Sequence, residues 1–167
     1  CRTIAEGDTM KLLIVSDSHR EMTYLCEAVR RERPDAVIHL GDLVSDADRL
    51  AEEFLGLPVL SVRGNCDILP RAEELLRTFE GVTVFGVHGH RYGVKQGLLR
   101  FSLAAQEQQA QVALFGHTHI PYCRQEGGLW LLNPGACGGR APSCGIVTVD
   151  GGKAVCCVKD LLLEETL

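Results

Sequence analysis

The sequence lacks both a long apolar run and an excess of basic residues. None of its apolar runs reaches the roughly 20 residues that a helix needs to span a bilayer, and the N-terminus lacks the apolar core of a secretory signal. The 167 residues contain 17 Lys and Arg against 22 Asp and Glu, a formal net charge of −5. A protein that binds extended nucleic acid usually presents clustered basic residues to the phosphates. We therefore expect a cytoplasmic protein that binds neither membranes nor long nucleic acids, while a small phosphate ester held by a metal remains open.

The eight cysteines form no C-x-x-C pair, which argues against a structural zinc site built from paired thiolates. A chain of this length can bury enough apolar surface to fold without disulfides. We therefore expect free thiols in a reducing compartment.

The composition fits one ordinary globular domain, with 46% apolar and 23% charged residues. Residues 1–9 are predicted to be a polar leader or a disordered extension that precedes Met10. Residues 10–167 are predicted to form a single domain.

Short β-branched runs alternate with amphipathic stretches in the first 62 residues, which predicts parallel strands and an α/β core. The later part changes to hairpin patterns around Gly127-Gly128 and Gly151-Gly152. The predicted strands and hairpins are 11–16, 36–40, 58–62, 82–89, 112–116, 122–133 and 144–158. The predicted helices are 22–33, 46–56 and 95–109, and residues 70–78 are predicted to be helical or mixed.

Polar side chains follow five of these strands at their carboxyl ends, where open α/β sheets bind ligands. Of the six histidines, five lie at these ends, and His39, inside a strand, is interpreted as structural. The side chains concerned are Asp17, His19, Asp42, Asn65, His88, His90, His117 and His119.

Taken singly, each of these residues is typical of a turn or a helix cap. Taken together, they supply carboxylate, amide and imidazole ligands, which suit Mn, Fe, Zn, Co or Ni. Seven donors (the set above without His90) are too many for one ion but suffice for two if one carboxylate bridges. Two divalent ions about 3.5–4 Å apart stabilise in-line displacement at phosphorus. The sequence therefore predicts a dinuclear site.

The ordered motifs D-x-H, G-D, G-N, H and G-H-x-H resemble those of the calcineurin-like metallophosphoesterase family over residues 11–160. The segments "GNCD" and "NPGA" (133–136) are similar to the small bacterial and archaeal phosphodiesterase branch. The resemblance implies a four-layer α-β-β-α sandwich with two mixed sheets. It also implies that the first ion is held by Asp17, His19 and His119, that Asp42 bridges, and that the second ion is held by Asn65, His88 and His117.

The function implied is hydrolysis of a small phosphodiester by a hydroxide that bridges two ions, with Mn²⁺ expected and Ni²⁺, Fe²⁺, Zn²⁺ or Co²⁺ as alternatives. The residues expected to act in catalysis are Asp42, Asn65 and His90. Two other functions stay open: a phosphomonoesterase, and a non-catalytic protein-interaction scaffold of the same fold, as in the retromer subunit. Self-association into a homo-oligomer also stays open.

Cys66 stands where many family members carry a histidine that helps the leaving group. A thiol is a weak hydrogen-bond donor and cannot carry a positive charge, so that role cannot be transferred to Cys66. His90 is a candidate substitute, with a purely structural role as the alternative. A nucleophilic role for Cys66 is disfavoured because no activating base is evident.

Five residues near the motifs receive roles by position. Cys66, Arg20 and Arg91 are candidate substrate contacts, as is Arg140. Asp67 is expected to orient a neighbouring ligand or to cap the next helix.

Overall fold

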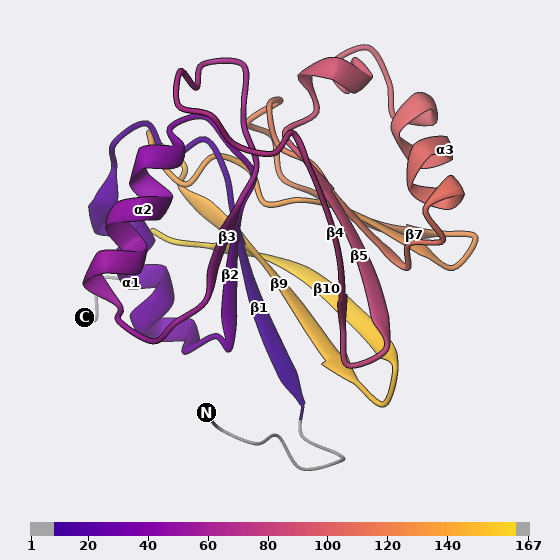
Figure 1. Ribbon diagram of the computed structural model, residues 1–167, viewed down its shortest axis with the longest axis horizontal. Coiled ribbons are helices and arrows are strands. Elements are labelled where there is room, and N and C mark those ends of the chain that lie inside the picture. Colours follow the sequence, from indigo (N-terminus) through magenta and orange to yellow (C-terminus); the bar gives the residue numbers. More distant parts are fainter. Residues whose placement is uncertain (1–8, 163–167) are drawn as a thin grey trace.

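The computed structural model describes residues 9–162 and contains two mixed five-stranded sheets packed face to face (Figure 1). The strands are β1 (Met10–Val15), β2 (Ala36–His39), β3 (Val59–Ser61), β4 (Glu74–Phe79), β5 (Val82–Val87), β6 (Val112–Leu114), β7 (Tyr122–Glu126), β8 (Leu129–Asn133), β9 (Ser143–Asp150) and β10 (Lys153–Asp160). The helices are α1 (Met22–Glu32), α2 (Val44–Glu53) and α3 (Leu99–Glu107), with a short 3-10 helix η1 (His90–Tyr92).

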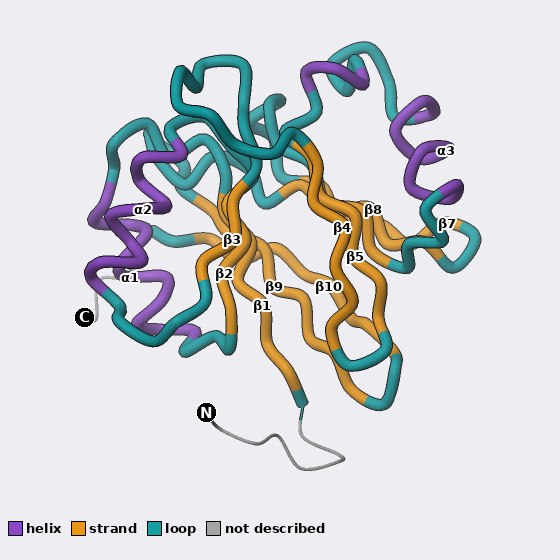
Figure 2. The backbone as a smooth tube through the Cα atoms, in the orientation of Figure 1, coloured by secondary structure: helices purple, strands orange, loops and turns teal. Residues whose placement is uncertain are grey.

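The first sheet has the order β10-β9-β1-β2-β3 and the second has the order β4-β5-β6-β8-β7. Strands β1, β2 and β3 run parallel, as predicted, because α1 and α2 return the chain across one face. Those two helices cover the outer face of the first sheet, and α3 covers the outer face of the second (Figures 1 and 2). The predicted four-layer α-β-β-α sandwich is confirmed.

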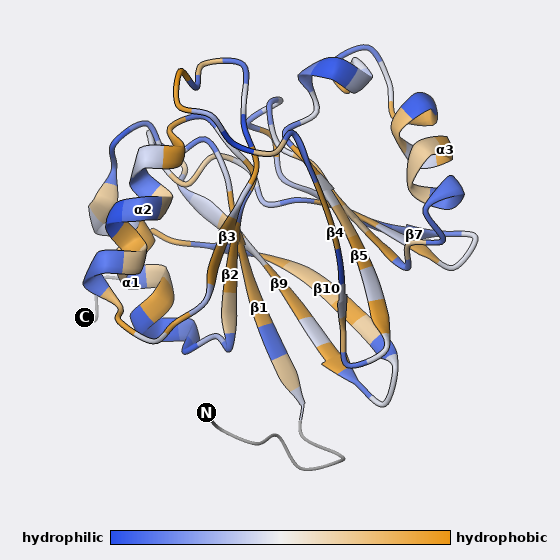
Figure 3. Cartoon of the chain, in the orientation of Figure 1, coloured by the Kyte–Doolittle hydropathy of each residue, from blue (hydrophilic) through white to orange (hydrophobic). Residues whose placement is uncertain are grey.

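Alternation along β1 shows how the layers are held together, since successive side chains of a strand point to opposite faces. Leu12 and Ile14 belong to the apolar cluster between the two sheets. Leu13 and Val15 belong to a second cluster under α1 and α2. All four are fully buried. Because both faces of the strand are covered, β1 is apolar along most of its length (Figure 3).

A third cluster fills the space between the second sheet and α3. It is built around Phe85, Phe101 and Phe115. The ring of Phe101 lies 6.0 Å from Phe85 and 5.3 Å from Phe115, centroid to centroid, within the range of favourable aromatic pairs.

The prediction for residues 70–78 was wrong, because this segment contributes the edge strand β4 instead of a helix. Its Glu, Leu and Arg residues favour a helix, but the segment pairs antiparallel with β5 in register from Glu74 to Phe79. Only Leu75 of this strand is buried, so the sequence carries little of the alternation that marks a strand. Tertiary pairing overrides local propensity here.

Helix α3 is shorter than predicted, because the segment before it (93–98) forms turns. Gly93 has φ +63° and is the left-handed residue that ends η1. Both predicted hairpins are confirmed as β7–β8 and β9–β10. Strand β8 also pairs parallel with β6, so the later part of the chain is not wholly antiparallel.

The predicted leader lies outside the described residues except for Thr9, and β1 begins at Met10. Within residues 9–162, no helix combines the length and the apolar character needed to cross a bilayer.

Replacement of Leu25 by alanine tests the packing of α1. Leu25 is fully buried under this helix, so Leu25→Ala is expected to lower the free energy of unfolding by about 2–5 kcal/mol. Leu99→Ala, at a position that is 74% exposed on α3, is the matched control and should change it by at most about 0.5 kcal/mol. Equal losses in urea titrations of the two variants would contradict this packing.

Candidate metal centre

The predicted site residues meet at the carboxyl ends of strands from both sheets. Asp17, Asp42 and Asn65 follow β1, β2 and β3 of the first sheet, while His88 and His117 follow β5 and β6 of the second. Figure 2 shows the connecting loops gathered at this edge. The site therefore lies on the seam between the two sheets.

One group of candidate ligands comprises Asp17, His19 and His119, whose ligand atoms all lie within 4.8 Å of one another. His119 Nε2 lies 3.1 Å from Asp17 Oδ1. The carboxylate is fully buried, whereas both imidazoles are exposed. The group thus opens to solvent on its histidine side, where a substrate could approach.

A second group comprises Asp17, Asp42 and His88, again with ligand atoms within 4.8 Å of one another. His88 Nε2 lies 3.5 Å from Asp42 Oδ1 and 3.0 Å from Asn65 Oδ1. The His117 ring lies 5.1 Å from the His88 ring, centroid to centroid. Asp17 belongs to both groups, whereas the family resemblance gives the shared position to Asp42, so the bridging role of Asp42 stays a prediction.

Two features of the donor atoms fit a cation. Asp17 Oδ1 is buried and receives no hydrogen bond from the described residues, although Oδ2 accepts hydrogen bonds from Ser16 Oγ at 2.6 Å and from the His117 backbone N–H at 3.2 Å. A buried carboxylate oxygen without a partner is costly. A divalent ion would remove that cost.

The imidazole of His88 supplies the other feature. Its Nδ1 lies 2.8 Å from the Leu40 carbonyl oxygen, which can only accept, so Nδ1 carries the proton in the neutral ring. The lone pair of Nε2 then faces Asn65 Oδ1 and Asp42 Oδ1, which are acceptors too. Three acceptors that converge on one point suit a bound cation, and Leu40 fixes the ring in the way that metal-binding histidines are usually held.

The backbone at the site adopts an unusual conformation that the sequence did not indicate. Asp17, His19, Asp42, His117 and His119 have φ values of 53°, 48°, 56°, 66° and 61°. Residues other than glycine seldom occupy this left-handed region, although Asp and His do so more often than most, and strained residues tend to cluster at functional sites. The turns therefore hold these side chains in place at a cost in backbone energy.

Gly41 and Gly64 allow the turns after β2 and β3 to touch. A Cβ atom on Gly64 would lie 2.2 Å from Asp42 Oδ1, and one on Gly41 would lie 2.5 Å from the Gly64 nitrogen. Because neither glycine has a side chain, Asp42 can approach the Asn65 segment closely. The G-D and G-N motifs thus have a steric reason.

Asp67 ties the same two turns together. Its carboxylate accepts hydrogen bonds from the backbone N–H groups of Asp42, Leu43, Val44 and Gly64, at 2.9, 2.7, 2.7 and 2.7 Å. Asp67 thus holds the backbone of Asp42 as expected, while the ligand role of Asp42 stays a prediction. The expected cap of the next helix was wrong: Asp67 caps the N-terminus of α2, which precedes it in the chain, and the next element is a strand.

His39 has a structural role, as interpreted from the sequence. Its Nδ1 accepts a hydrogen bond from the Gly41 N–H at 3.1 Å, so Nε2 donates to Ser18 Oγ at 3.0 Å. The Ser18 hydroxyl in turn donates to Asp46 Oδ2 at 2.7 Å. Burial lowers the pKa of His39, which favours this neutral form. The chain of bonds links the Asp17 turn to the Asp42 turn.

Asn133, in the "NPGA" segment, is a positioning residue that sequence reasoning did not identify. It is fully buried, and its Nδ2 donates to the Gly116 carbonyl at 3.0 Å and to Thr118 Oγ1 at 2.9 Å. These bonds fix the turn that carries His117 and His119. The "NPGA" motif drew attention to this segment, but the sequence did not show that Asn133 binds the turn after β6.

The backbone of Cys66 contacts the site directly. The Cys66 N–H donates to Asp42 Oδ1 at 3.0 Å, and Asn65 Nδ2 lies 3.4 Å from Cys66 Sγ. Desolvation and then the charge of Asp42 raise the pKa of the Cys66 thiol. The thiol is therefore protonated near neutral pH, which argues against a nucleophilic role.

His90 is placed close to the candidate ligands. Its ring lies 5.5 Å from that of His88 and 6.2 Å from that of His117, centroid to centroid. Its Nδ1 is buried and has no partner among the described residues. Burial, followed by the charge of His88, lowers the pKa of His90.

The candidate arginines are less well placed. Arg91 pairs with Glu73, so it would have to leave that carboxylate to meet a phosphate. Arg20 contacts Asp46 through its backbone N–H at 2.8 Å, and its side chain is exposed, as is that of Arg140.

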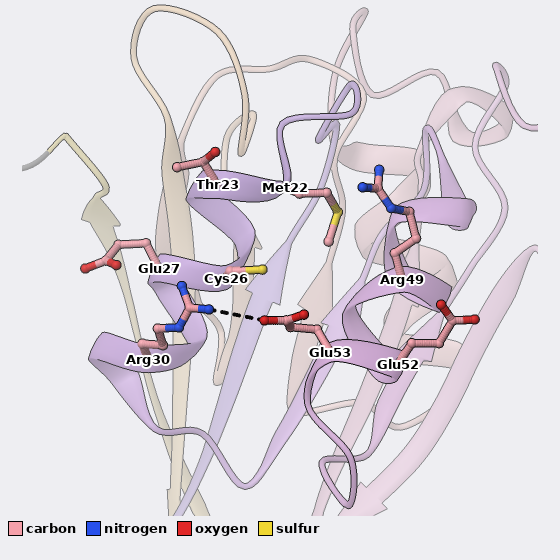
Figure 4. Close-up of a pocket in the computed structure, with 8 residues that line it drawn as sticks. All are labelled: Met22, Thr23, Cys26, Glu27, Arg30, Arg49, Glu52 and Glu53. Atoms are coloured by element: carbon pink, nitrogen blue, oxygen red, sulfur yellow. Dashed lines mark hydrogen bonds and ion pairs between the residues drawn. The ribbon is translucent and has the colours of Figure 1, made fainter.

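A groove of about 540 Å³ lies elsewhere, between α1 and α2. Figure 4 shows Arg30 and Glu53 pointing toward one another across it, with Cys26 on its wall. None of the candidate ligands lines this groove, so it is separate from the site at the strand ends.

The family model described as calcineurin-like phosphoesterase superfamily domain matches residues 10–152. A Bacillus subtilis protein named "Probable metallophosphoesterase YsnB" is 36% identical over 130 residues, which cover 76% of this chain and 75% of that protein. Phosphodiesterase YfcE of Escherichia coli is 28% identical, with coverage of 84% and 89%.

Two solved structures show the same fold. A Streptococcus pneumoniae protein described as a predicted phosphoesterase superposes with a TM-score of 0.78 at 26% identity, covering 92% of this chain and 91% of that one. Entamoeba histolytica Vps29, in complex with zinc, superposes with a TM-score of 0.71 at 18% identity, covering 91% and 99%. The second likeness concerns the fold alone.

Replacement of Asp67 by asparagine tests how the site is held together. An amide would turn N–H groups toward backbone N–H donors, so Asp67→Asn is expected to lower the free energy of unfolding by about 1–3 kcal/mol and to weaken metal binding. Asp48→Asn, which removes a surface ion pair with Arg71, is the control and should cost about 0–1 kcal/mol. Chemical denaturation and metal titration measure both, and unchanged metal affinity in Asp67→Asn would contradict the positioning role.

Proposed function

The chain belongs to the calcineurin-like phosphoesterase superfamily, and on that basis we propose that it hydrolyses small phosphodiesters with two divalent ions. The observation that carries the proposal is the convergence of three possible ligand atoms on the seam between the sheets: Asp17 Oδ1, which accepts no hydrogen bond from the described residues, His88 Nε2 and Asp42 Oδ1. Such a donor set suits Mn²⁺ among several divalent ions.

Two divalent ions, when bound, would supply a nucleophilic hydroxide near neutral pH and would neutralise the charge on phosphorus. The protein's own part is to position the ligands before substrate arrives. Asp67 and the Cys66 N–H fix Asp42, and the Leu40 carbonyl fixes the His88 ring. Rigid placement of this kind avoids reorganisation during the reaction.

His90 is the group we assign to the leaving oxygen. Its lowered pKa leaves it mostly neutral at pH 7, so it donates as a neutral N–H or through the small protonated fraction. The neutral thiol of Cys66 is the weaker donor. This assistance is modest, which favours diesters with good leaving groups over poor ones.

The charge of the substrate, the pairing of Arg91 and the name of a relative all favour diesters over monoesters. A diester carries one negative charge where a monoester carries up to two at neutral pH, and the nearby Arg91 is already paired with Glu73. The E. coli relative is itself named a phosphodiesterase. The scaffold alternative is disfavoured because all seven candidate ligands are present, and the likeness to Vps29 does not bear on activity.

Hydrolysis of an activated diester tests the proposal. The purified protein is expected to hydrolyse bis(p-nitrophenyl) phosphate, to lose this activity in EDTA and to regain it with Mn²⁺ or Ni²⁺. p-Nitrophenyl phosphate is the monoester comparison and should react more slowly. Turnover that persists after verified removal of metal would refute the mechanism, and a faster monoester would make the protein a phosphomonoesterase.

Substitution at Cys66 tests the leaving-group assignment. Cys66→His adds a better proton donor, so it is expected to raise kcat for a diester with a poor leaving group about tenfold or more, with unchanged metal content. Cys66→Ala is the control and should keep wild-type turnover of activated diesters, because the contact to Asp42 comes from the backbone N–H. If Cys66→Ala abolishes activity at full metal occupancy, the thiol has a chemical role that we exclude.

A further inference from the structure

A pocket of about 430 Å³ lies beside the candidate metal centre. Its walls are mainly apolar and include Val94, Phe115, Ile120 and Tyr122. The Phe115 and Tyr122 rings are 6.1 Å apart, centroid to centroid. This volume is within the usual range for small-molecule sites.

One close contact and one chain connection place the pocket next to the candidate ligands. Gly89, between His88 and His90, packs so closely on the pocket that a Cβ there would lie 2.7 Å from Val94 Cγ2. Thr118, which also lines the pocket, lies between His117 and His119 in the chain. The pocket is therefore adjacent to both histidine pairs.

The polar groups of the pocket are on Lys95, Thr118 and Tyr122, and the Tyr122 hydroxyl donates to Glu126 Oε1 at 3.4 Å. The Thr118 hydroxyl is engaged, because it accepts hydrogen bonds from Asn133 Nδ2 at 2.9 Å and from the Ile120 N–H at 3.2 Å. Lys95 is exposed and forms no hydrogen bond or ion pair within residues 9–162.

We propose that this pocket binds an aromatic ring on the ester group that stays on phosphorus, with Lys95 paired to the phosphate. The inference rests on the proposed function and narrows its substrate class to diesters with one aryl or nucleoside arm. His90, the group assigned to the departing oxygen, does not line the pocket, which assigns the pocket to the retained arm. The ring would lie against Phe115, Tyr122 and Ile120.

The test uses three p-nitrophenyl diesters that expel the same phenolate and retain a phenyl, a 5′-thymidyl or a methyl group. We expect kcat/KM about tenfold higher for the two ring-bearing diesters, mainly through KM, since tenfold corresponds to about 1.4 kcal/mol of ring burial. A high value for the thymidyl diester alone identifies a nucleoside arm, and high values for both identify any aryl arm. Equal kcat/KM for all three would overturn the proposal.

Substitutions at two lining residues test whether the difference in kcat/KM between the diesters arises in this pocket. Ile120→Ala should lower kcat/KM of the ring-bearing diesters about threefold more than that of the methyl diester, because Ile120 is 67% exposed at the rim. Lys95→Gln should lower all three about tenfold. The matched controls are Val155→Ala and Lys153→Gln on β10, outside the pocket, and neither should change any value.

A binding measurement separates this proposal from the proposed function. Calorimetry of the Mn²⁺-loaded protein should give a Kd for phenylphosphonate about tenfold below that for methylphosphonate, and Ile120→Ala should reduce this difference. If no diester is hydrolysed, the proposed function fails, and these two ligands still decide the pocket. Equal Kd values would overturn it.

Discussion

The carboxylate of Asp67 holds the turns after β2 and β3 in contact, and the geometry of the candidate centre depends on this link. It accepts four backbone N–H groups, three from the start of α2 and one from Gly64. The approach is possible because Gly41 and Gly64 lack side chains that would clash. Asp42 is thereby held in a left-handed conformation, with φ 56°.

The centre also depends on the carboxyl ends of strands from the two stacked sheets lying close together. The His88 ring, from the second sheet, donates to the Leu40 carbonyl, from the first, and the His117 N–H donates to Asp17 Oδ2. These contacts set imidazole lone pairs opposite carboxylate oxygens. This arrangement favours a cation, and the apolar layer between the sheets keeps it rigid.

The sequence predicted the parts of the fold that have a strong local period. The continuous apolar run of β1 and the apolar face of α1 were sufficient to predict the α/β layers, and the Asp and His residues at strand ends were sufficient to predict where the candidate site lies. It did not predict β4, because Glu74 to Phe79 is an edge strand with a helix-like composition. Nor could the sequence show which groups Asp67 and Asn133 bind, since hydrogen bonds across 25 and 17 residues leave no local pattern.

The central claim is that this seam holds two divalent ions, and the most direct measurement is the number of Mn²⁺ ions bound per chain. We expect a titration followed by calorimetry and elemental analysis to saturate at two ions per chain in the wild type. In Asp17→Asn, which weakens the carboxylate common to both groups of ligands, the number should fall. Saturation of the wild type at one ion or none, or an Asp17→Asn variant that still binds two ions with unchanged affinity, would contradict the account.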